Sequence, residues 1–137
     1  MRKIKKEEKN IENNKYPFLY FCFCRIVKDL HDLKIAHRDL KPDNLVFSKK
    51  DSSWKLIDFG VAKMEADLSE SKEYNICGTR MYAIPKIQEM RYLKELKGKL
   101  KMSLKANDYY ALGITLLRVK FLLIQPFDGK VLRYMLS

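Results

Sequence analysis

The chain has 137 residues, of which 47% are hydrophobic and 33% charged, and its formal net charge is +11. This composition is typical of one globular domain and excludes a disordered chain. Three cysteines without paired metal-ligand spacing argue against a disulfide framework or a zinc site, and favour a reducing compartment. The apolar runs are too short to span a bilayer, and the first sixteen residues lack the apolar core of a secretory signal. The sequence therefore predicts a soluble cytoplasmic protein.

The positive charge is spread along the chain, with local concentrations only in residues 1–9 and 86–105. Acidic residues lie between the lysines, and no motif combines basic and aromatic side chains for nucleic-acid binding. A lysine-rich surface in contact with water is therefore favoured. Binding of nucleic acid or of an anionic membrane surface through residues 86–105 is kept as a third, weaker hypothesis.

The first part of the chain predicts a charged arm and a helix. Residues 1–15 are rich in Lys, Glu and Asn, and we expect them to be disordered. From Pro17 to about Leu33, apolar side chains recur at steps of three and four residues, which predicts a helix with one buried face. The apolar positions are Leu19, Phe23, Ile26, Val27 and Leu30.

A hairpin is predicted next. Two short apolar strands at residues 45–47 and 54–57 are joined by the turn-forming residues 49–53. Because a hairpin holds its two ends together, Asn44 and Asp58, which flank it, are expected to lie close enough to share a metal ion.

The second half of the chain predicts a loop and a long helix. Residues 61–80 have weak periodicity and many polar side chains, so we expect a mobile loop. Residues 86–105 are basic, with apolar side chains at mixed helical spacing that Gly98 interrupts. An apolar helix is predicted from Asp108 to about Leu123, with the aspartate as a candidate N-cap.

The most informative pattern is formed by residues 37–44 and 58–60. In this order the two stretches resemble the catalytic loop and the metal-binding turn of a eukaryotic-type serine/threonine protein kinase. Gly78-Thr79, Pro85 and the helix start at Asp108 resemble further parts of the same domain. The two stretches read His37-Arg38-Asp39-Leu40-Lys41-Pro42-Asp43-Asn44 and Asp58-Phe59-Gly60.

The resemblance implies a mainly α, α+β fold. The expected architecture is a partial large lobe of a kinase, in which helices accompany a short β-hairpin that carries the catalytic and metal-binding loops. The implied organisation is a charged N-terminus at residues 1–15, a partial kinase domain at residues 16–127 and a truncated tail at residues 128–137.

The implied reaction is transfer of the γ-phosphoryl group of ATP to a protein serine or threonine hydroxyl, with Mg²⁺. Asp39 would orient the hydroxyl and accept its proton, Lys41 would place an ammonium beside the phosphoryl group, and Thr79 would hydrogen-bond to both. Asn44 and Asp58 would supply oxygen ligands to Mg²⁺ and, with Lys41, hold the nucleotide phosphates.

The resemblance also implies structural and regulatory residues. His37 is expected to pack under the catalytic loop as an uncharged core histidine, Phe59 to pack beneath the metal-binding turn, and Gly60 to let the backbone reverse. Asp108 would accept backbone hydrogen bonds from the catalytic loop. Arg38 would pair with a phosphate on the loop that follows. The candidate acceptors of that phosphate are Ser69, Ser71 and Tyr74.

The sequence also departs from the kinase pattern. No glycine precedes Gly60, so a glycine-rich ATP loop is not expected in this chain, and the residues before the first helix are too few for a small lobe. The chain has Ile84-Pro85-Lys86 where the family has Ala-Pro-Glu, which reverses a charge. We therefore expect little or no activity from the chain alone, and marginal stability.

Two main hypotheses follow. The first is a serine/threonine kinase fragment that acts on a protein substrate and that another kinase or a further chain completes. The alternative is a non-catalytic, pseudokinase-like interaction protein or a truncated gene product. The intact residues of the catalytic loop and metal-binding turn favour the first, whereas Lys86 and the missing small lobe favour the second.

Overall fold

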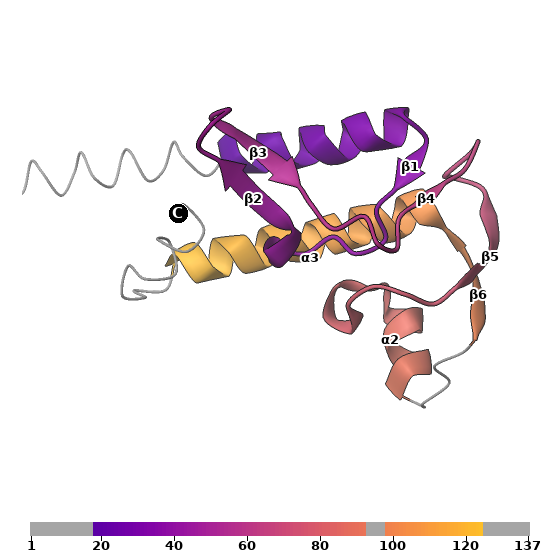
Figure 1. The fold of residues 1–137 in the computed structure, drawn as a ribbon. Helices are drawn as coiled ribbons and strands as arrows, with labels where there is room; N and C mark the ends of the chain where they lie inside the picture. Colours follow the sequence, from indigo (N-terminus) through magenta and orange to yellow (C-terminus); the bar gives the residue numbers. More distant parts are fainter. Residues whose placement is uncertain (1–17, 93–97, 125–137) are drawn as a thin grey trace, which may run out of the picture.

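The structure, a computed structural model, describes residues 18–92 and 98–124 (Figure 1). The predicted disordered arm at residues 1–15 and the tail at residues 128–137 lie outside these described residues. Within them, helices predominate and are accompanied by three small antiparallel sheets of two strands each. No helix in the described part of the chain is both long and apolar enough to cross a membrane.

Two long helices lie side by side and enclose the first hydrophobic core. The first helix covers residues 18–32, and α3 covers Leu104–Ile124 (Figure 1). The helix predicted from the apolar face of residues 17–33 is confirmed, since Phe23 and Val27 on that face are almost completely buried. The other buried members of this core are Leu40, Leu45, Tyr82, Ala111, Leu112 and Val119.

The predicted hairpin is also confirmed. Strand β2 (Leu45–Ser48) pairs with β3 (Ser53–Leu56), and Leu45 lies opposite Leu56. The ring of Trp54 in β3 packs edge-on against Phe23, with ring centroids 5.2 Å apart, so the hairpin is fixed to the first helix. The end of the hairpin next to Asn44 and Asp58 is also held by the core, because Leu45 belongs to it.

The mobile loop predicted for residues 61–80 is partly wrong, because two strands lie within it. Strand β4 (Lys63–Met64) pairs with β1 (Ile35–Ala36), and β5 (Ser71–Asn75) pairs with β6 (Lys99–Ser103). Of residues 86–105, for which helical spacing was noted, those up to Tyr92 lie in α2 (Pro85–Tyr92), which begins at a proline, as helices often do, whereas residues 99–103 form β6.

The side chains of β6 alternate between buried and exposed positions, a pattern that the helical interpretation missed. Leu100 and Met102 are buried while Lys99 and Lys101 between and beside them are exposed, which is the period of two of a strand. These two residues join a second hydrophobic core, which links β5 and β6 to α2 and to the start of α3. Its other members are Ala36, Leu68, Tyr74, Ala83, Ile87 and Leu104.

The central helix begins earlier than predicted. Its first residue is Leu104, and the Ser103 hydroxyl oxygen accepts a hydrogen bond of 3.1 Å from the backbone N–H of Ala106. Ser103 is thus the N-cap, and the interpretation of Asp108 as a helix cap is wrong. Asp108 lies more than one turn inside α3, where its side chain is free to contact other elements.

Candidate active site

The loop at residues 37–44 is attached to α3 through one buried carboxylate. Asp108 is completely buried and accepts hydrogen bonds of 2.8 Å from the backbone N–H groups of both His37 and Arg38. His31, on the first helix, contacts the same carboxylate through Nε2 at 2.9 Å. The carboxylate therefore fixes the backbone at the start of the loop between the two long helices.

His37 is a satisfied core side chain. It is completely buried, its Nε2 donates to the backbone oxygen of Ile57 at 3.0 Å, and its Nδ1 accepts from the backbone N–H of Asp39 at 3.3 Å. Both bonds form together when the ring is neutral and carries its proton on Nε2. Phe59 packs edge-on against this ring, with centroids 5.0 Å apart, but keeps 48% of its surface exposed. His37 thus connects the catalytic loop to the residues that precede Asp58.

Asp39 lies at the centre of a polar network. Its Oδ1 accepts a hydrogen bond of 2.6 Å from the backbone N–H of Thr79, and its Oδ2 is 3.0 Å from Lys41 Nζ. The Lys41 ammonium also donates to Thr79 Oγ1 at 2.9 Å. The three residues predicted to be catalytic are therefore brought together from two segments that are far apart in sequence.

The network controls the charge of Asp39. Burial alone would raise the pKa of its carboxyl group, but the hydrogen bonds from Thr79 and Lys41 outweigh burial and hold the pKa below its ordinary value. The pKa of Lys41 is raised, chiefly by its hydrogen bond to Asp39. Both groups are thus ionised at neutral pH, as a pair that positions a substrate hydroxyl requires.

Asn44 and Asp58 flank the same end of the hairpin. The backbone oxygen of Asn44 accepts a hydrogen bond of 2.9 Å from the N–H of Ile57, the residue before Asp58. The Asn44 amide nitrogen donates to the backbone oxygen of Asp39 at 2.8 Å, so the amide oxygen is oriented away from that contact. Asp58 is exposed and adopts a positive φ of 62°, and one of its carboxylate oxygens accepts from the N–H of Gly60 at 3.2 Å.

These two residues fit the requirements of Mg²⁺. The ion prefers hard oxygen ligands, takes only one or two of them from the protein, and keeps water and phosphate as the others. An amide oxygen and a carboxylate at one end of a hairpin match that donor set. No group of three or more His, Cys, Asp or Glu side chains suited to a metal ion occurs among the described residues.

Arg38 turns away from the catalytic residues toward strand β5. Its Nη2 donates to the backbone oxygen of Asn75 at 2.6 Å and its Nη1 to that of Val61 at 3.4 Å. Tyr74, one of the three candidate acceptors of a phosphate, is buried in the second core. Ser69 is exposed and donates to Asp67, and Ser71 is exposed at the start of β5.

The sequence did not indicate two features of the site, the close backbone contact at Gly78 and the buried side chain of His31. Gly78 has a φ of +79°, and a Cβ atom on it would lie 2.2 Å from the backbone oxygen of Arg38, so the chain passes too close there for any side chain. His31 lies four residues after Val27, on the apolar face of the first helix. A polar side chain on such a face was the available signal for a buried partner, which is Asp108.

Residues 1–130 match the family described as the protein kinase domain. This chain belongs to the protein kinase family. The resemblance that the motifs indicated is therefore confirmed.

Curated relatives of this kinase domain include three serine/threonine or cyclic-nucleotide-dependent kinases. The chain is 36% identical over 101 residues to the ovarian-specific serine/threonine-protein kinase Lok of Drosophila melanogaster, over 72% of this chain and 19% of that protein. It is 34% identical over 105 residues to the cGMP-dependent protein kinase, isozyme 1, of the same organism, over 77% of this chain and 12% of that protein. It is 35% identical over 85 residues to the serine/threonine-protein kinase DCLK3 of Homo sapiens, over 56% of this chain and 12% of that protein.

Proposed function

We propose that this chain holds the phosphoryl-transfer residues of a serine/threonine protein kinase and corresponds to part of the large lobe of the domain. The observation that carries the proposal is the network of Asp39, Lys41, Thr79 and Asn44, in which Asp39 contacts the other three through hydrogen bonds or an ion pair of 2.6–3.4 Å. The names of the relatives support protein serine or threonine as the substrate, and membership of the protein kinase family supports ATP as the donor.

The proposed chemistry places Asp39 at the acceptor. The oxygen of the substrate hydroxyl bonds to the γ-phosphorus of ATP, the bond from that phosphorus to the β–γ bridging oxygen breaks, and ADP leaves. The Asp39 carboxylate orients the hydroxyl and accepts its proton. Positioned general bases of this kind accelerate reactions by roughly 10²–10⁴-fold.

Lys41, Asn44 and Asp58 complete the proposed site. The Lys41 ammonium, which the carboxylate of Asp39 and the hydroxyl of Thr79 hold in place, is suited to the negative charge of the transferring group. Mg²⁺, when bound to the nucleotide, neutralises phosphate charge and fixes the direction of transfer. Asn44 and Asp58 would hold it through their oxygens.

A second function, binding to a partner that covers the site, is favoured by the exposed residues around Asp58. Residues 57–60 are all exposed, and Ile57 and Phe59 are large apolar side chains with 42% and 48% of their surface in contact with solvent. Side chains of this kind beside a catalytic residue suit contact with another chain or another kinase. Such a partner would either complete the nucleotide site or use the lobe only for binding.

The proposal is tested by phosphate transfer from labelled ATP to a generic basic protein, in the presence of Mg²⁺. Asp39→Asn and Asp58→Ala should each abolish the transfer that the unmodified chain supports. Asp43→Asn is the matched control, because Asp43 is an exposed carboxylate of the same loop that hydrogen-bonds to none of Asp39, Lys41 and Thr79, and its charge makes only a minor contribution to the raised pKa of Lys41.

Transfer that Asp43→Asn retains and the other two variants lose would support catalysis by these residues. Transfer that survives Asp39→Asn would contradict the assigned role. A folded chain without any transfer would favour the binding function, and the same assay would then be repeated with a catalytically dead kinase domain added as the completing chain.

A further inference from the structure

Strand β6 is an element that the catalytic motifs do not explain. It lies between α2 and α3 and pairs along its whole length with β5, from Ser71 opposite Ser103 to Asn75 opposite Lys99. The ladder continues beyond β5, because the N–H of Ile76 donates to the backbone oxygen of Gly98 at 3.4 Å. The inference drawn from this ladder rests on the proposed function, since it concerns how the same site is kept in order.

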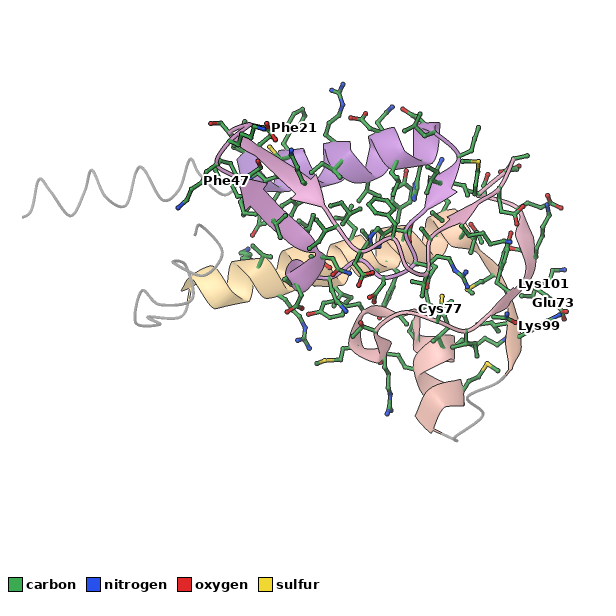
Figure 2. All side chains as sticks on the ribbon, viewed as in Figure 1. Phe21, Phe47, Glu73, Cys77, Lys99 and Lys101 are labelled. Atoms are coloured by element: carbon green, nitrogen blue, oxygen red, sulfur yellow. The ribbon has the colours of Figure 1, made fainter. Side chains whose placement is uncertain are left out.

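The inner face of the β5–β6 ladder is part of the second hydrophobic core. Tyr74 of β5 lies opposite Leu100 of β6, and both are about 95% buried, at 5% exposure each. Met102 is also buried, and all three pack in one cluster with Ile87 of α2. In Figure 2, Glu73, Lys99 and Lys101 point away from this cluster on the outer side of the ladder. The ladder is thus a one-sided sheet fixed to the body of the domain.

A second attachment fixes the other end of β6. The backbone oxygen of Leu68, just before β5, accepts hydrogen bonds from the Ser103 hydroxyl at 3.0 Å and from the N–H of Lys105 at 2.9 Å. Leu68 itself is buried in the second core. The segment from Leu68 to Ile76 is therefore held at both ends and along its length by β6 and the start of α3.

The held segment leads directly into the catalytic network. Arg38 bonds to the backbone oxygen of Asn75, Gly78 passes against the backbone of Arg38, and Thr79 donates its N–H to Asp39. Only three residues lie between Asn75 and Thr79. The position of the Thr79 amide is consequently set from one side by β5 and from the other by the catalytic loop.

We propose that β6 is a built-in brace that orders residues 68–79 and positions Thr79 against Asp39 in the chain without any phosphate on that segment. A phosphate on the segment would order it through charge-assisted bonds to the arginine. Here the Arg38 guanidinium already donates to main-chain oxygens of Asn75 and Val61. Leu100 is the positioning residue of the brace, and it acts through Tyr74.

The test is hydrogen–deuterium exchange with mass spectrometry on the full chain, prepared free of phosphate and checked by its intact mass. Peptides within residues 71–79 should exchange at least about tenfold more slowly than the same peptides in urea. Leu100→Ala should remove most of this protection while peptides of α3 remain protected, and Leu100→Met should restore it.

A second measurement connects the brace to the site. The N–H signal of Thr79, followed by NMR, should shift in Leu100→Ala, because the displaced amide loses its hydrogen bond to Asp39. A surface variant covers the case in which Leu100→Ala unfolds the chain: Lys101→Glu places a second negative charge opposite Glu73 and should weaken the same protection. Lys120→Glu, the same charge change on an exposed position of α3, should leave it unchanged.

Rapid exchange of residues 71–79 beside a protected α3 would overturn the proposal, as would protection that appears only after Ser69 or Ser71 is phosphorylated. Protection that none of the β6 variants changes would also overturn it. Neither readout needs ATP or phosphate transfer. The brace can therefore fail while the proposed kinase function stands, and the reverse holds as well.

Discussion

Asp39 illustrates how single residues determine what this site can do. Its carboxylate is largely enclosed, yet each oxygen has a strong donor, the Thr79 N–H on one and the Lys41 ammonium on the other. A carboxylate held by these bonds is a weak base, but the orientation of its oxygens is fixed. Phosphoryl transfer depends more on the direction of the hydroxyl than on early removal of its proton, so this arrangement suits the proposed role.

Removal of the lysine should raise the pKa of Asp39. In the unmodified chain the hydrogen bonds from Thr79 and Lys41 outweigh burial, so the folded-state pKa lies below the ordinary value of 3.8. The carboxylate therefore stabilises the fold above that value, and this contribution is lost as the pH falls through the lower, folded-state pKa. In Lys41→Met, burial has less opposition and the pKa should rise, as an NMR titration of the carboxyl carbon would show. An unchanged pKa would mean that the ion pair does not form in solution.

Gly78 offers a test of the close contact between the two catalytic segments. Its φ is positive, and a Cβ would lie 2.2 Å from the backbone oxygen of Arg38. Gly78→Ala should lower the free energy of unfolding by at least about 1–3 kcal/mol, the cost of a strained backbone, as measured by urea unfolding.

Gly113 is the matched control, because a Cβ there meets nothing within 4 Å. Gly113→Ala, inside a helix, should stabilise by roughly 0.5–1 kcal/mol. Equal effects of the two changes would contradict the close contact.

Among the secondary-structure elements, α3 anchors the catalytic loop through Asp108. The two carboxylate oxygens receive the N–H groups of His37 and Arg38, and His31 adds a third contact. The helix and the loop are 70 residues apart in sequence, so this carboxylate is a direct link between distant elements.

Asp108→Asn should separate the loop from the helix. An amide has one oxygen instead of two, so one buried N–H loses its acceptor and faces another donor, at a cost of about 1–3 kcal/mol. Urea unfolding should show this loss, and the N–H signals of His37 and Arg38 should shift in NMR spectra. Asp32→Asn, at an exposed carboxylate on the first helix, should change neither. Retained stability in the Asp108 variant would show that the two N–H groups have other partners.

The elements also show what the sequence could predict. The helix at residues 18–32 and the β2–β3 hairpin were predicted because each has a clear local period and local turn signals. Strands β5 and β6 were not predicted, because each pairs only with a distant segment and buries only one or two side chains. The catalytic motif identified Asp39, Lys41 and Thr79 as a set, whereas the contacts of Arg38 and Gly78 depend on tertiary packing.

At the scale of the whole molecule, the described residues leave large apolar side chains in contact with solvent. Phe18 and Phe21 on the first helix are 66% and 63% exposed, and Leu117 on α3 is 65% exposed. Full burial of such a side chain contributes about 1.5–3 kcal/mol, whereas a whole domain is stable by only about 5–15 kcal/mol. The chain alone should therefore have marginal stability, and these faces should bind an apolar dye.

A pair of leucines on α3 tests whether this exposure persists in solution. Leu112 is 7% exposed and belongs to the first core, whereas Leu117, five residues later, is 65% exposed. Leu112→Ala should lower the free energy of unfolding by about 2–5 kcal/mol, because it removes a buried side chain and leaves a cavity. Leu117→Ala should change it by no more than about 0.5 kcal/mol, as is usual for a surface substitution, and should reduce dye binding. The measurement is urea unfolding of both variants at two protein concentrations.

If Leu117→Ala were as costly as Leu112→Ala, and more so at high concentration, a second copy of the chain would be covering that face. If the cost were equal at both concentrations, the face would be buried within the chain itself, and marginal stability would lose its physical basis.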